Sequence, residues 1–182
     1  MKLLTLLLSL LALGATAQIS DANEQISDAV LALDEGDRDA ASVYGYNAEN
    51  GFMLLRKGTN SLICIADDPN KSGFSVACYH ENLEPFMARG RALKEEGKDR
   101  NEIEIIREEE AKAGKLKMNE KASTLYVMSG NTKEEANLRW VVYIPWATAE
   151  STGLPIKPMV AGGPWIMFPG TYRAHIMITP AN

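Results

Sequence analysis

The sequence predicts an α+β fold: a mainly antiparallel sheet with an N-terminal helix and a central helical pair. Runs rich in β-branched and aromatic residues are separated by turns rich in Gly, Pro and Asn, as in strands. These runs cover residues 41–46, 52–55, 61–66, 74–80, 124–128, 138–144, 165–168 and 174–178. Strand runs outnumber helical ones and most links are short, which favours antiparallel neighbours. An open sheet and a partly closed barrel both fit this pattern.

The stretch from Ser61 to His80 is the expected centre of the sheet, because two apolar runs flank a polar loop that contains Pro and Gly. If the hairpin turns about Lys71, Cys64 and Cys78 lie directly opposite each other. Cross-strand partners are about 4.5–5.5 Å apart, close to the separation that a disulfide requires. We expect a Cys64–Cys78 bridge, with two buried free thiols as the alternative.

The N-terminal segment has the three parts of a secretory signal. Lys2 supplies the positive charge, Leu3 to Leu13 the apolar run, and Ala15-Thr16-Ala17 a cleavage site that leaves Gln18 first. The run is shorter than the roughly 20 residues of a membrane-spanning helix. We expect residues 1–17 to be a cleaved signal peptide and 18–182 a single exported domain, periplasmic or extracellular. A retained anchor or a buried helix is the alternative. Because an exported protein enters an oxidising compartment, we expect its two cysteines to form a disulfide.

Composition narrows the class of partner. The chain has 182 residues, of which 46% are hydrophobic and 24% charged, and its net charge is −5. This composition is typical of a folded globular protein. The acidic balance disfavours nucleic acid, which needs clustered basic charge. Beyond the signal, no segment is long and apolar enough to suggest a membrane span.

Helical spacing and turn signals define the other elements. Ile26, Ala29, Val30 and Leu33 form one helical stripe after a possible Asp21 cap, with Gly36 as the stop. The Asn50-Gly51 turn and the turn at 57–60 predict an antiparallel meander of the first four strands.

The central helical pair begins after His80. Pro85 suits a first turn, Gly90 allows close packing, and Gly97 ends the first helix. Asn101 with Glu104 resembles a capping box for the second helix, which runs through Ala113. The run 107–110 is expected to face solvent.

Titratable side chains give the candidate catalytic site. His80 ends a strand just before the helix that starts near Glu84, and His175 lies in the last strand. These residues, with Glu150 from a loop, could serve a small hydrolase or a metal-dependent enzyme. The alternative is that each histidine is a partly buried structural residue with a hydrogen-bond partner.

Other polar and aromatic residues are candidates for binding: Arg89, Trp140, Ser151 and Thr152. The last two belong to a Ser/Thr/Gly-rich stretch that could equally be a solvated turn. Metal-ligand spacing, dinucleotide-binding glycines and a nucleophile elbow are all missing, so we expect no metal and no cofactor.

Three segments resemble a group of small secreted bacterial proteins to which no activity is assigned. They are 57–69, 74–80 with 83–91, and 147–153, and the similarity extends over roughly 26–180. The resemblance implies an exported bacterial protein of single-domain type and transfers no catalytic residue. Taken together, these features favour a non-catalytic binding or interaction domain whose partner is a small molecule or a protein. The enzyme with His80, Glu84, His175 and Glu150 is the alternative.

Overall fold

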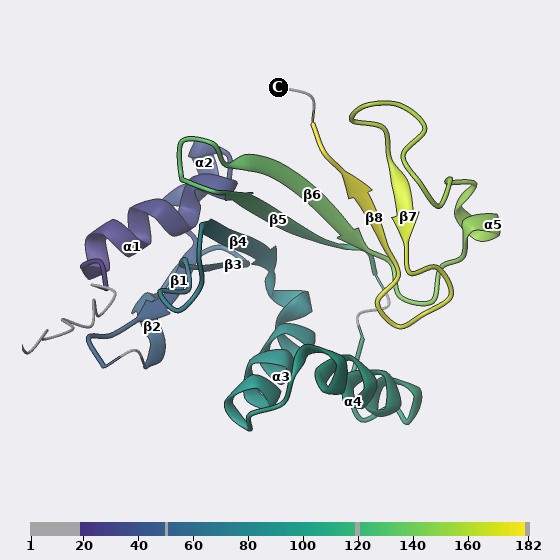
Figure 1. The fold of residues 1–182 in the computed structure, drawn as a ribbon, viewed down its shortest axis with the longest axis horizontal. Helices are drawn as coiled ribbons and strands as arrows, with labels where there is room; N and C mark the ends of the chain where they lie inside the picture. Colours follow the sequence, from purple (N-terminus) through teal and green to yellow (C-terminus); the bar gives the residue numbers. More distant parts are fainter. Residues whose placement is uncertain (1–18, 50, 119–120, 181–182) are drawn as a thin grey trace, which may run out of the picture.

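A computed structural model describes residues 19–49, 51–118 and 121–180. An open, mixed sheet of eight strands carries helices on both of its faces, in the order β2-β1-β3-β4-β5-β6-β8-β7 (Figure 1). The sheet is open, which decides between the two architectures that the sequence left possible. The proposed signal peptide lies outside the described residues. Among the described helices, none has the length and apolar character needed to cross a membrane.

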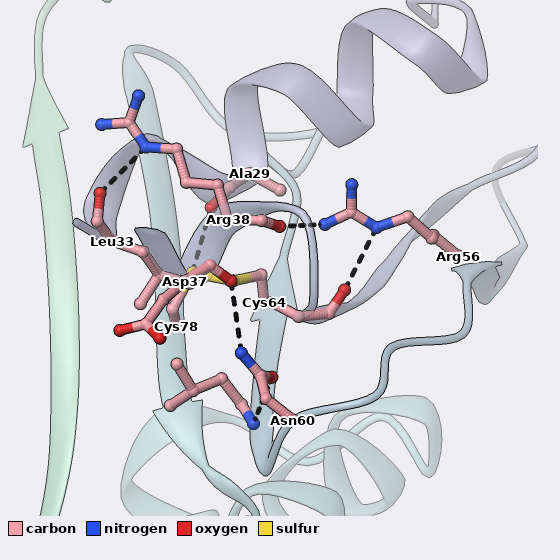
Figure 2. Close-up of a disulfide and its surroundings, with 10 residues drawn as sticks. Ala29, Leu33, Asp37, Arg38, Arg56, Asn60, Cys64 and Cys78 are labelled. Atoms are coloured by element: carbon pink, nitrogen blue, oxygen red, sulfur yellow. Dashed lines mark hydrogen bonds between the residues drawn. A yellow bond between two sulfur atoms is a disulfide. The ribbon is translucent and has the colours of Figure 1, made fainter. Parts of the chain in front are cut away.

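The stapled hairpin is formed by β3 (Leu62–Ile65) and β4 (Phe74–His80). Cys64 pairs with Cys78 in the antiparallel register, and a disulfide joins the two side chains. Both cysteines are fully buried. The Cys78 Sγ atom lies 3.2 Å from the carbonyl oxygen of Ala29, so the helical segment at the N-terminus packs directly on the bridge (Figure 2). The prediction of a bridge between opposed residues is confirmed.

The predicted four-strand meander is wrong. β1 (Ser42–Tyr46) and β2 (Phe52–Arg56) form a hairpin, but β3 pairs in parallel with the other side of β1. The link after β2 crosses the start of β1, because Thr59 and Asn60 donate backbone hydrogen bonds to the carbonyl of Ala40. A Cβ atom on Gly58 would lie 2.3 Å from that same carbonyl oxygen. Gly58 therefore permits the crossing that sends β3 to the far side.

One face of the sheet is covered by α1 (Ala22–Ala29) and the 3₁₀ turn η1 (Val30–Ala32). Asp21 caps α1 by accepting from the backbone N–H groups of Asn23 and Glu24. The residues from 21 to 33 thus form a short α-helix and a tighter turn, and Gly36 lies inside α2 (Glu35–Arg38) instead of ending the helix. The core on this face contains Val30, Val43, Cys64, Val76 and Cys78.

Hydrogen bonds tie the segment that follows α1 to the sheet (Figure 2). Arg38 donates to the carbonyl of Leu33 at 2.9 Å, and Asn60 donates to the carbonyl of Asp37 at 3.2 Å. Arg56, at the end of β2, donates to the carbonyls of Arg38 and Ala41. These bonds fasten the link between α1 and β1 around the buried bridge.

The other face is covered by α3 (Glu84–Glu95), with α4 (Arg100–Lys112) beside it. Tyr79, Leu83, Leu125 and Val141 form the core beneath α3. A short 3₁₀ turn, η2 (Glu81–Leu83), leads from β4 into α3, and Pro85 lies in the first turn of the helix. The side of α3 that faces α4 includes Gly90, where a Cβ atom would lie 2.9 Å from the guanidinium of Arg107. The expected close packing at Gly90 is confirmed.

Two expectations for α4 are wrong. Its capping box consists of Asp99 and Glu102, so the N-cap lies two residues before the predicted Asn101 and the helix begins at Arg100. Arg107, expected on a solvated face, is buried, and its guanidinium lies 4.0 Å from the Phe86 ring centroid. An arginine buries its stem readily when its charged head has partners, and Glu104 supplies one at 2.7 Å.

The second half of the sheet consists of β5 (Ser123–Gly130), β6 (Asn137–Tyr143), β8 (His175–Ile178) and β7 (Trp165–Met167). Antiparallel pairs join β4 to β5, β5 to β6, β6 to β8 and β8 to β7. The loop between β6 and β7 carries the short helix α5 (Ala149–Thr152) at the far end of the sheet from β2 (Figure 1).

Candidate functional site

The sheet register separates the two histidines. In β4, His80 shares a face with Cys78, which is the α1 side. In β8, His175 shares a face with Met177, which pairs with Val141 on the α3 side. The two histidines therefore lie on opposite faces of the sheet, and one site cannot use both of them.

His80 and Glu84 each have a structural partner, whereas Glu150 does not lie near them in the sequence or in the paired strands. The Nδ1 atom of His80 accepts from the N–H of Asn82 at 3.2 Å and caps η2. Glu84 accepts from the hydroxyl of Tyr79 and from Arg91, both at 2.5 Å. Glu150 is exposed on α5. In the described part of the chain, no three His, Cys, Asp or Glu side chains are grouped so as to hold a metal ion.

His175 is buried beside two rings. Its ring centroid lies 5.1 Å from that of Tyr143 and 5.8 Å from that of Phe168, and Nδ1 lies 2.7 Å from the carbonyl of Arg173. Burial lowers the pKa of His175 and outweighs the contact with that carbonyl, so the neutral ring is favoured. These contacts describe a packed structural histidine.

The predicted binding residues lie apart from one another. Arg89 joins α3 to α4 through Glu110 at 2.8 Å and also contacts Glu96 at 3.1 Å. Ser151 exchanges hydrogen bonds with Thr148 in the capping box of α5.

The other two predicted binding residues are Thr152 and Trp140. The hydroxyl of Thr152 donates to the carbonyl of Thr148 at 2.9 Å, within the same short helix. Trp140, in β6, is 41% exposed on the α1 side of the sheet. The four predicted residues therefore form no common site.

A cleft between the β1–β2 hairpin and α3 combines the features of a ligand site. Its volume is about 360 Å³. The hairpin, the β3–β4 loop and α3 each contribute to its walls. The lining residues are Tyr46, Gly51, Phe52, Asp68, Asn70, Arg91, Lys94 and Glu95. Aromatic rings and convergent polar groups thus border one small space, and both occur in small-molecule pockets, although the lining here is more charged than is usual for them.

Phe52 lies at the centre of the aromatic wall. Its ring stacks on Tyr44 at 5.4 Å and meets Tyr46 edge-on at 5.6 Å. The register explains this grouping: Tyr46 pairs with Phe52, and Tyr44 lies two residues away on the same face. Alternation along two neighbouring strands therefore directs three rings toward α3.

The guanidinium of Arg91 lies over the Phe52 ring and belongs to the same wall of the cleft. The guanidinium carbon lies 5.3 Å from the Phe52 ring centroid, a favourable cation–π distance. The same guanidinium donates to the Tyr79 hydroxyl at 3.1 Å and to Glu84 at 2.5 Å. Because Tyr79 is fully buried in the sheet, its hydrogen bond holds the Arg91 guanidinium in place.

Asp68 and Lys94 form an ion pair on the side of the cleft where the β3–β4 loop meets α3. Lys94 donates to the Asp68 carboxylate at 2.8 Å, and the backbone N–H of Asn70 donates to it at 3.1 Å. Burial alone would raise the pKa of Asp68, but the hydrogen bonds from Lys94 and Asn70 lower it overall. Asp68 is thus a buried carboxylate that fixes the β3–β4 loop against α3.

The phenol of Tyr46 stays neutral in this setting. Burial, and then the negative charges of Asp68 and Asp67, raise the pKa of Tyr46 to about 12. A neutral phenol can donate or accept a hydrogen bond. The cleft therefore offers a ligand an apolar ring surface, one neutral hydroxyl and side chains of both charges.

A second polar cluster lies between α4 and the loop before β8. Glu104 accepts from Arg107 at 2.7 Å, from the Tyr172 hydroxyl at 2.7 Å and from Arg173 at 2.9 Å. Arg173 also lies 3.7 Å from the Phe168 ring centroid. Both carboxylate oxygens of Glu104 already accept hydrogen bonds or ion pairs from neighbouring side chains, so this cluster is a structural clamp.

Sequence reasoning missed most of the cleft. Arg91 and Glu84 are seven residues apart, which is two turns of one helical face and a detectable signal. The alternation of Tyr44 and Tyr46 with the Asn50-Gly51 turn also indicates a shared aromatic face. Asp68 gave no such signal, because its burial depends on Lys94, 26 residues further along the chain.

Comparison with protein-family models, with curated proteins and with solved structures finds no match to this chain.

Proposed function

We propose that the chain is an exported, non-catalytic binding protein whose ligand occupies the cleft between β2 and α3. Support for export comes from the signal pattern of residues 1–17 and from the Cys64–Cys78 bridge, since stable disulfides belong to oxidising compartments. Identification of Gln18 as the first residue of the processed protein would test the export step.

The observation that carries the binding proposal is the fixed arrangement of Phe52 and Arg91. The ring is held by two neighbouring tyrosines, and the guanidinium is held by Tyr79 and Glu84. A surface whose side chains are already ordered loses little conformational entropy when a ligand binds. The two groups thus form a preorganised wall beside an open volume of about 360 Å³.

The lining favours a small amphipathic ligand with a flat apolar part. The rings of Phe52 and Tyr46 suit an aromatic group, which gains both burial of apolar surface and ring contacts. Lys94 and Glu95 are exposed at the rim and carry opposite charges. The Lys94 ammonium has three donors and uses one of them on Asp68, so this pair of residues still suits a zwitterionic head group. The ligand class that we infer is a small aromatic zwitterion, such as an aromatic amino acid or a short aromatic peptide.

A thermal-shift screen of the processed protein tests this proposal. The probes are aromatic amino acids and dipeptides, matched aromatic acids and matched aromatic amines. We expect the zwitterions to raise the melting temperature most, since a ligand at a hundred times its Kd adds about 2.7 kcal/mol. The shift should shrink in the Phe52→Leu and Lys94→Met variants.

Two control variants locate the effect. Lys157→Met removes an exposed lysine from the β6–β7 loop, and Trp140→Ala removes an exposed ring from the α1 face. Both should keep the full ligand-induced shift. A response that persists in Phe52→Leu and Lys94→Met but disappears in Trp140→Ala would overturn the cleft as the binding site.

No observation favours the hydrolase or metal-dependent enzyme over this proposal. Its two histidines lie on opposite faces of the sheet, and Glu84 is engaged by Tyr79 and Arg91.

A further inference from the structure

We propose that two copies of the chain associate through β2, antiparallel and about a two-fold axis that passes beside Leu54. The strand order makes β2 one edge of the sheet and β7 the other. Edge strands expose unpaired backbone N–H and C=O groups that can pair with another strand. This interaction surface is additional to the binding cleft and does not rest on the proposed ligand.

The two edges of the sheet differ in how they are protected. At β7, the N–H of Ile166 donates to the carbonyl of Pro155 at 2.9 Å, and the side chain of Ile166 is fully buried. At β2, Met53 is 44% exposed and Leu54 is 41% exposed. Natural edge strands usually carry charged residues that prevent pairing. The one charged residue of β2, Arg56, is turned back onto the carbonyls of Arg38 and Ala41.

The hairpin register identifies which backbone groups of β2 are free. The N–H of Asn47 donates to the carbonyl of Gly51, so Tyr46 and Phe52 form a non-hydrogen-bonded pair. By alternation, Met53 directs its backbone groups toward β1, and Leu54 directs its N–H and C=O to the open edge. An antiparallel copy that places Leu54 opposite the partner's Leu54 closes two hydrogen bonds at the axis.

Charges at the ends of the hairpin fit the same register. With Leu54 opposite the partner's Leu54, Lys57 lies beside the partner's Gly51, two residues from the partner's Glu49. Lys57 and Glu49 are both exposed, and neither has an ion pair within the described parts of the chain. Two-fold symmetry brings these opposite charges together twice, at the two ends of an apolar centre. The surface is thus self-complementary, as an isologous interface requires.

The association is expected to be weak. A pair of five-residue strands buries much less than the roughly 1,200 Å² of a standard stable interface. Sedimentation velocity over a series of protein concentrations should therefore show a reversible shift from monomer toward dimer. A single monomeric species throughout the series would contradict the proposal.

Engineered cysteines test the register. The Cα atoms of a hydrogen-bonded antiparallel pair are about 5.5 Å apart, within the range of a disulfide. Leu54→Cys should therefore form a covalent dimer under oxidising conditions. Met53→Cys is the matched control: its exposure is similar, but the two copies of residue 53 are offset along the strands beyond the roughly 7 Å limit. Cross-linking that is equally fast in both variants would overturn the register.

Charge reversal tests the ends of the interface. Lys57→Glu should weaken the dimer, because it places like charges together, and the double variant Glu49→Lys/Lys57→Glu should restore it. Lys157→Glu makes the same charge change at an exposed loop and should leave the dimer unchanged. Equal weakening by Lys57→Glu and Lys157→Glu, without rescue in the double variant, would refute pairing at these ends.

Discussion

Two regions on opposite faces of one sheet are held together by different chemistry. Around β3 and β4, a disulfide lies in an apolar core beneath α1. Between α4 and the loop before β8, the carboxylate of Glu104 binds Arg107, Tyr172 and Arg173. The first region is fixed covalently and by burial of apolar surface. The second depends on charges that remain paired only within a limited pH range.

Helix α3 connects the two regions. Arg91 and Lys94 contact Tyr79 and Asp68 of the stapled hairpin and its loop. Arg89 contacts Glu110 of α4, and Phe86 lies under the guanidinium of Arg107. The cleft is therefore built where the helix meets the covalently fixed region, which gives its walls a rigid support. Three experiments can separate the two kinds of stabilisation.

Removal of the bridge should have the largest effect. The two cysteines are 14 residues apart, and a loop of that size contributes about 3 kcal/mol to stability. We expect Cys64→Ala/Cys78→Ala to lose about that much free energy of unfolding in urea titrations. Reductant should destabilise the wild-type chain and leave the double variant unchanged. An unchanged urea midpoint in the variant would show that apolar packing alone holds this region.

Removal of the charge on Glu104 should have a smaller and more local effect. Glu104→Gln leaves two partly buried arginines with one partner fewer, and we expect a loss of about 2 kcal/mol. Hydrogen exchange should accelerate in α4 and in the loop before β8, while β3 and β4 stay protected. Glu108→Gln breaks an exposed pair with Lys112 on the same helix and should cost less than about 0.5 kcal/mol. Equal losses in the two variants would contradict the clamp.

Acid should act first at His175, which begins β8 and contacts the carbonyl of Arg173 in the second region, with the smallest of the three effects. Because burial lowers the pKa of His175, folding favours the neutral ring. This contribution is fully present above the unfolded pKa of about 6.5 and is lost as the pH falls toward the folded pKa. Urea titrations of His175→Gln should show a shallower decrease in stability over this range than the wild type shows. If the stability of the two proteins fell in parallel with pH, protonation of His175 would not contribute to acid destabilisation.

Local patterns predicted much of the fold. The opposed cysteines and the apolar runs on both sides of a polar loop belong to one hairpin, and the glycine at position 97 acts at the end of one helix. The parallel pairing of β1 with β3 was not predictable in this way, because it depends on the passage of Gly58 across the backbone of Ala40. The burial of Arg107 was not predictable either, because it depends on contacts with Phe86 and Glu104 that exist only in the folded chain.

The candidate site was less predictable than the fold. Histidine and hydroxyl side chains can take part in catalysis or binding, but His80, Ser151 and Thr152 act here as caps or local hydrogen-bond partners. The cleft is assembled from common residue types in three separate segments, and no single segment carries a motif. Only the fold brings Phe52 against Arg91, 39 positions later in the numbering.

Nuclear magnetic resonance of the ¹⁵N-labelled processed protein gives the most direct test of the central claim, that ligands bind between β2 and α3. During titration with an aromatic amino acid, we expect the largest amide shifts at Gly51, Phe52, Asn70 and Lys94, which surround the cleft. Shifts centred on Trp140 in β6, with those four amides unmoved, would contradict the account.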